Sequence, residues 1–124
     1  LSVSGVTDLT RLARVIYADS RPIAYLVDGL PVDILPAADL ASGFTGSVLD
    51  LLLKRGDPKL VQSRTEIKAI GATSEVARAL QIQRADVLLH FAAYLYSESS
   101  RVVDYSFSYF LPGYFRFHVV RRVG

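Results

Sequence analysis

Hydrophobic and polar residues alternate along the C-terminal third of the chain, which predicts extended strands there. Within 101–110 the apolar side chains fall on one face and the polar ones on the other, because strand side chains have a period of two. The apolar face holds Val103, Tyr105, Phe107 and Tyr109, and the polar face holds Asp104, Ser106 and Ser108. We predict strands over 86–96 and 101–110, joined by a polar turn, and a further strand within 111–122 after an aromatic corner. A polar, hydroxyl-bearing face fits a sheet that is covered on one side and open to a ligand or to water on the other.

Three more strands are predicted upstream. Residues 11–17 and 22–30 flank a short turn and form the first hairpin, with a proline at the start of the second strand, where a missing N–H is tolerated. Residues 59–71 alternate over most of their length and predict a long strand. The segment 31–46, which is interrupted by proline and glycine, is interpreted as a loop with a helical turn at 36–40.

Two helices are predicted between these strands. Ser47 caps a helix over 48–55 that ends at Gly56, and Thr73 caps a second helix over 74–81. The order is strand, strand, helix, strand, helix, then three strands. Most connections are short enough for antiparallel neighbours, so the sequence predicts an α+β domain with both helices packed on one face of an antiparallel sheet.

Composition narrows the class of protein. A chain of 124 residues with 51% hydrophobic side chains is long enough for one domain with a single core. It contains no apolar run of membrane-spanning length, no signal-peptide pattern and no cysteine, which agrees with a cytoplasmic protein and with no membrane partner. A net charge of +2 is too balanced for a nucleic-acid surface. Because the chain starts at Leu1 and has no methionine, we expect it to be part of a larger protein.

Motifs for catalysis and cofactor binding are missing from the sequence. It has no glycine-rich phosphate loop, no paired-histidine metal spacing and no nucleophile elbow, so we predict no catalytic residue, no metal and no cofactor. His90 and His118 are each isolated on a predicted strand, where a histidine is usually a hydrogen-bonded packing residue. Arg14 is either a solvated residue at a sheet edge or a bidentate ligand for an anion.

The order of these elements and several phrases resemble the effector-binding (UTRA) domain of the HutC subgroup of GntR-type bacterial transcription regulators. The resemblance covers roughly 10–122, and the phrases that carry it are RVIYADSRPIAYLVDGLPVDILP, SVLDLLLKRG, TEIKAIGATSEVARALQI and ADVLLHFAAYLYSESSRVVDYSFSYFLPGYFRFHVVRR. It implies a chorismate-lyase-like α+β fold over 1–124, a small-molecule effector and a homodimer. It also implies a winged helix-turn-helix domain upstream that this chain lacks, so that DNA is contacted only through that domain.

The resemblance carries over to single positions with several departures. Arg14 matches the first-strand arginine that contacts the effector in relatives. Leu26 stands where relatives often carry a pocket glutamate, Ala93 where many have an arginine, and Phe107 at another polar or basic pocket position. Leu-Pro-Gly-Tyr at 111–114 replaces a charged corner. With so few cations in the lining, a less charged or partly aromatic metabolite is expected in preference to a phosphosugar.

We therefore predict a pocket between the polar face of 102–110 and the first hairpin. The predicted effector-binding residues are Arg14, Ser106, Ser108, Tyr96 and, more weakly, Glu66. A register slip of one residue would instead place Tyr105 and Phe107 in the pocket. Two other functions stay open: a stand-alone chorismate-lyase-like enzyme, and a dimerisation module with a vestigial pocket.

Overall fold

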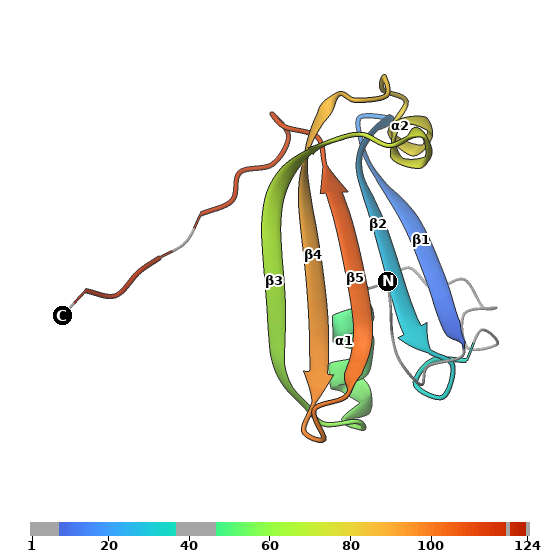
Figure 1. The fold of residues 1–124 in the computed structure, drawn as a ribbon, viewed down its shortest axis with the longest axis vertical. Helices are drawn as coiled ribbons and strands as arrows, with labels where there is room; N and C mark the ends of the chain where they lie inside the picture. The colour runs from blue at the N-terminus through green and yellow to red at the C-terminus, as the bar shows by residue number, and fades with distance from the viewer. Residues whose placement is uncertain (1–7, 37–46, 119, 124) are drawn as a thin grey trace.

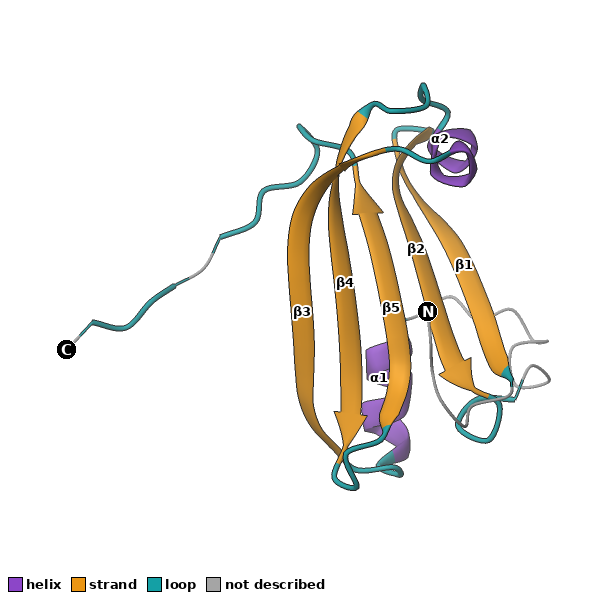
Figure 2. Cartoon of the chain, in the orientation of Figure 1, coloured by secondary structure: helices purple, strands orange, loops and turns teal. Residues whose placement is uncertain are grey.

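The computed structural model describes residues 8–36, 47–118 and 120–123, and it contains one antiparallel sheet and two helices. The strand order across the five-stranded sheet is β1-β2-β5-β4-β3 (Figures 1 and 2). The elements are β1 (Leu9–Ala18), β2 (Arg21–Pro31), α1 (Val48–Arg55), β3 (Leu60–Gly71), α2 (Ser74–Leu80), β4 (Val87–Ser97) and β5 (Val102–Phe110). The α+β class and the five strands predicted before residue 111 are therefore confirmed. The helical turn predicted at 36–40 lies almost wholly outside the described residues.

The helix boundaries follow the predicted capping residues. Ser47 Oγ accepts a hydrogen bond from the Asp50 backbone N–H at 3.3 Å, and α1 ends at Gly56, which adopts the left-handed conformation at φ 72°. Thr73 Oγ1 accepts from the Val76 N–H at 3.4 Å and starts α2 in the same way. These bonds satisfy backbone donors that have no partner inside a helix.

The strand predicted within 111–122 is wrong. The described residues of this segment form only an isolated bridge between Pro112 and Phe115, and the chain then runs away from the sheet (Figure 1). Since β5 already pairs with β2 on one side and β4 on the other, a following strand has no free edge beside it. The aromatic residues instead pack on side chains of the sheet: Phe115 lies 4.7 Å from Phe110, and Phe117 lies 4.6 Å from Phe91, between ring centroids.

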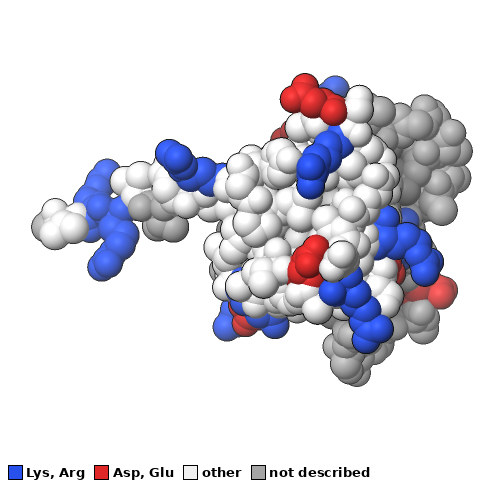
Figure 3. Space-filling view, turned by 90° about the horizontal axis from the view of Figure 1, so that it is seen from above, with Lys and Arg blue, Asp and Glu red and all other residues white. Residues whose placement is uncertain are grey.

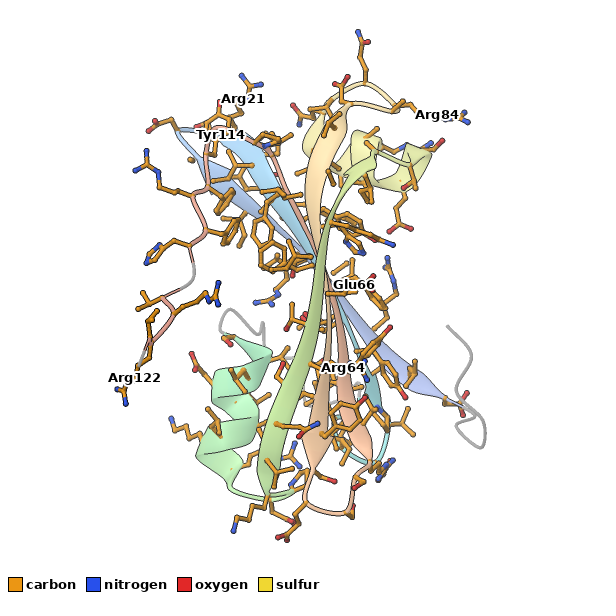
Figure 4. All side chains as sticks on the ribbon, turned by 60° about the vertical axis from the view of Figure 1, so that its left-hand side comes forward. Arg21, Arg64, Glu66, Arg84, Tyr114 and Arg122 are labelled. Carbon is orange, nitrogen blue, oxygen red and sulfur yellow. The ribbon has the colours of Figure 1, made fainter. Side chains whose placement is uncertain are left out.

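The two helices cover opposite faces of the sheet, so their predicted placement on one face is wrong. Figure 4 shows α1 and α2 on either side of the twisted sheet. The two hydrophobic clusters explain this, because the central strands bury apolar side chains on both faces and each face needs a cover. On the α2 face, the helix packs with Tyr25, Ala72, Leu88 and Leu111; on the α1 face, the helix packs with Leu30, Ile34, Leu35 and Val103.

Among the described residues, no helix is long and apolar enough to cross a membrane. Both helices are short, and each buries only one side against the sheet.

Candidate functional site

A hollow lies between the start of α1 and the sheet, and it is lined mainly by polar side chains. Its volume is about 120 Å³, and its lining residues are Arg14 of β1, Leu26 and Asp28 of β2, Ser47, Val48 and Leu49 at the start of α1, and Asp104, Ser106 and Ser108 of β5. A second hollow of about 140 Å³ shares Leu49, Asp104 and Ser106 with the first and extends to Ser63, Ala93 and Leu95 on β3 and β4. We call the two together the α1 hollow.

Strand register brings Arg14 into this hollow. Arg14 on the edge strand β1 lies opposite Leu26 of β2, which in turn lies opposite Ser108 of β5. The arginine and the serine therefore point to the same face although 94 positions separate them in the sequence (108 − 14). The Arg14 guanidinium forms an ion pair with Asp28 of β2, with 3.4 Å between Nη2 and Oδ2.

A β-bulge at the start of β5 directs Asp104 into the hollow. Leu95 of β4 faces Asp104 while the next residue, Tyr96, faces Val102, so Val103 is the extra residue. Both residues on a bulge can point to the same side of the sheet. Val103 fills the core beneath α1, and Asp104 lies beside it on the same face. The predicted placement of Val103 with Tyr105 is wrong because of this bulge.

Asp104 and Asp28 form a buried carboxyl pair next to Arg14. Burial raises the pKa of Asp104 to about 9, helped by the negative charge of Asp28 and by the hydrogen bond between the two groups, while Arg14 opposes the shift. Near neutral pH, Asp104 is thus protonated and donates its proton to the Asp28 carboxylate. Asp104 Oδ1 is buried and has no hydrogen-bond partner among the described residues.

Comparison with known proteins places this architecture in one family. A family model of the UTRA domain matches residues 1–116. The chain belongs to the UTRA domain family. No match was found among curated proteins.

Several solved structures share the UTRA fold. A GntR-family transcriptional regulator from Enterococcus faecalis V583 is 25% identical with a TM-score of 0.76, and the match covers 91% of this chain and 81% of that one. A putative transcriptional regulator from Streptomyces coelicolor is 25% identical with a TM-score of 0.75, covering 92% and 77%. The effector domain of PhnF from Mycobacterium smegmatis is 16% identical with a TM-score of 0.76, covering 93% and 70%. The predicted UTRA family and its α+β fold are thereby confirmed.

Three of the five predicted site residues meet in this UTRA domain. Arg14, Ser106 and Ser108 line the α1 hollow. Glu66 and Tyr96 lie on the other face, in a separate depression of about 270 Å³ that also includes Arg64 and Tyr94; Glu66 and Arg64 are labelled on β3 in Figure 4. Strand parity causes the separation, because Glu66 pairs with Ala92, which pairs with Phe107 on the α2 face.

The positions taken from the family resemblance also lie on two different faces of the sheet. Leu26 and Ala93 do line the α1 hollow, so both positions give it apolar side chains where the resemblance implies charged ones. Phe107 does not, because it lies on the α2 face beside His90 with 6.1 Å between ring centroids. At the predicted corner, Arg21 lies over the ring of Tyr114 at 5.7 Å, far from α1 (Figure 4).

Sequence reasoning missed Asp28 and Asp104. A signal was present for each, since Asp28 interrupts an apolar run in a predicted strand, and Asp104 shares its alternation with two serines. A carboxylate in a strand that is otherwise apolar is rarely buried without a partner.

The histidines take no part in the hollow. His90 is buried, donates from Nδ1 to the Ser108 carbonyl oxygen at 3.1 Å and stacks on Tyr109, which agrees with a packing role. His118 is exposed and, contrary to prediction, lies outside any strand. Within the described ranges, no group of three histidine or acidic side chains could hold a metal ion.

Proposed function

We propose that this UTRA domain is the small-molecule-sensing part of a GntR-type transcription regulator of the HutC subgroup and that the effector binds in the α1 hollow. One observation carries the choice of site: the half-buried Arg14 and the buried Asp28 and Asp104 converge beneath α1 in a sheet whose interior is otherwise mostly apolar. Buried charged groups that converge in a hollow are typical of binding sites. An enzyme acting on a dicarboxylate would need several cations, and the described lining of this hollow contributes Arg14 alone.

The position of α1 offers a mechanism. The first residues of the helix line the hollow, while Val48 and Leu52 pack into the core cluster on the same face. A ligand seated between α1 and the sheet would favour one position of the helix. That preference shifts the population of two states, and a separate DNA-binding domain could read the shift.

We assign DNA contact to a winged helix-turn-helix domain outside this chain, in a cytoplasmic regulator. Figure 3 shows acidic and basic side chains scattered over the end of the molecule that it faces, with basic side chains also on the extended C-terminal segment. Since counterion release drives non-specific DNA affinity, a net charge of +2 supports little of it in this domain.

Replacing Arg14 with alanine should weaken effector binding by about 1.5–3 kcal/mol, the scale for hydrogen bonds to charged groups. The effector would first be identified by thermal-shift screening of metabolites, and its affinity then measured by calorimetric titration. Because Asp28 loses its ion-pair partner, stability will also fall, so the titration belongs well below the melting temperature.

Arg11→Ala is the matched control. Arg11 lies on the same strand, but its side chain is 55% exposed and pairs with Glu75 of α2, on the opposite face. This variant should bind the effector like the unchanged protein. Equal affinity in both variants would show that Arg14 is only a residue of the sheet edge.

We also propose that the domain acts as a homodimer. Among the described residues, no further strand pairs with the edge strands β1 and β3, and β3 exposes Val61 and Ile67. Open, apolar edges are usually covered in native proteins. Analytical ultracentrifugation should show a dimer at micromolar concentration, whereas a monomer alone over that range would contradict the proposal.

A further inference from the structure

Carboxyl groups outnumber cations in the described lining of the α1 hollow, and the second carboxyl stays neutral only by holding a proton. Asp28 and Asp104 each expose no more than 5% of their surface, and Arg14 is the one cation in the described lining. The other surrounding elements contribute serines and apolar side chains from α1, β3 and β4. Arg14 is paired with Asp28, and its charge only partly offsets the effect of burial on the pKa of Asp104, so this second carboxyl keeps its proton.

Asp104 supplies a second and independent sign of a ligand. It lies where the two parts of the hollow join, since it lines both. Its Oδ1 atom is buried without a hydrogen-bond donor among the described residues. A buried acceptor without a donor is costly, and a ligand that brings a donor removes that cost.

The N-terminus of α1 does not make the hollow favourable for an anion. A helix N-terminus attracts anions, but here Ser47 caps it and Asp50 already lies in the first turn. An anion entering the hollow would also face the Asp28–Asp104 pair. A phosphate group, with up to two negative charges, would be the worst fit.

Building on the proposed function, we propose that the effector carries a protonated nitrogen, such as an ammonium group, that binds Asp104 and Asp28 in the α1 hollow. With it in place, two cations face two carboxylates. Ser106 and Ser108 can then accept or donate hydrogen bonds to neighbouring polar atoms of the ligand, and Leu26 and Leu49 contact its carbon skeleton.

Binding should release a proton. Within the part of the chain that the structure describes, the ionisable groups that face Asp104 are Asp28 from β2 and Arg14 from β1, while Asp50 of α1 is exposed. Because burial raises the pKa of Asp104, the free protein holds a proton that an entering cation displaces. Affinity for the cation should therefore increase as pH rises from 6 to 8.5, by up to about tenfold per pH unit.

Three probes with the same carbon chain test the charge of the ligand: propylammonium, propionate and 1-propanol. Each is titrated into the ¹⁵N-labelled chain at pH 8, and the backbone amides of Asp104 and Ser106 are followed by NMR. Propylammonium should shift these amides in a saturable way, while the anion and the alcohol should not. In Asp104→Asn the propylammonium affinity should fall at least fivefold, and in the control Glu66→Gln, which removes an exposed carboxylate from the other face, it should not change.

The outcomes separate this inference from the proposed function. If propionate shifts the same amides as strongly as propylammonium does, the hollow remains a ligand site but the cationic ligand is overturned. If no probe shifts them, both the ligand class and the site are overturned. An effect that persists in Asp104→Asn overturns the role of that carboxyl.

Discussion

Replacing Leu52 with alanine should lower the free energy of unfolding by about 2–5 kcal/mol, the range for a leucine truncated in a packed core. Leu52 is 0% exposed and anchors α1 among Leu30, Leu35 and Val103. A cavity at this position removes contacts between the helix and the sheet that few other residues can replace. Urea denaturation followed by circular dichroism measures the change.

Leu53→Ala provides the control on the same helix. Leu53 is 58% exposed, so its truncation should change stability by no more than about 0.5 kcal/mol. Leu52 also fixes α1 against the sheet, and the first residues of α1 line the α1 hollow. The Leu52 variant should therefore lose effector affinity, and the Leu53 variant should not. Equal losses of stability in the two variants would show that α1 is not docked as the structure has it.

The elements were predictable wherever the local sequence decides them. Alternation over 59–71 and 101–110, and the caps Ser47, Gly56 and Thr73, each depend on neighbours in the chain. Strand periodicity and capping hydrogen bonds are local effects, so a single sequence carries them.

The arrangement of the strands and helices in space depends on contacts between distant parts of the chain, which no local sequence pattern contains. The bulge at Val103 arises because β5 has one residue more than the stretch of β4 that it pairs with, which only the pairing of the two strands reveals. Among the described residues, no strand follows 110 because β5 already has a neighbouring strand on each side. The assignment of α1 and α2 to opposite faces depends on which face each apolar strand residue occupies once all five strands are paired.

The difference between local patterns and long-range contacts also explains which site residues could be predicted. Arg14, Ser106 and Ser108 were predicted together because the parity after the bulge in β5 is correct and the family resemblance indicated Arg14. Glu66 lies on the other face because its side depends on two successive strand pairings, from β3 to β4 and from β4 to β5. Asp28 and Asp104 were missed because they interact only once β2 and β5 lie side by side in the folded sheet.

The stability of the protein should decrease as pH rises from 6 to 8, relative to an Asp104→Asn variant. Burial and the neighbouring Asp28 raise the pKa of Asp104 to about 9, whereas the unfolded chain has an ordinary aspartate value near 4. Between these values the folded state binds one more proton than the unfolded state, so raising the pH favours unfolding. The asparagine variant cannot lose that proton, and its side chain can still donate to Asp28.

The quantity to measure is the difference in unfolding free energy between the two proteins, from urea denaturation at pH 6, 7 and 8. One proton sets an upper limit of about 1.4 kcal/mol per pH unit, and we expect the advantage of the unchanged protein to shrink by about 1–2 kcal/mol over this range. Asp33→Asn is the control, because an exposed ion pair with Arg101 lowers the pKa of Asp33. Asp33 is thus ionised in both states throughout, and its difference should stay constant with pH. A constant or rising difference for Asp104 would mean that this carboxyl is ionised in the folded protein and that no proton is held beneath α1.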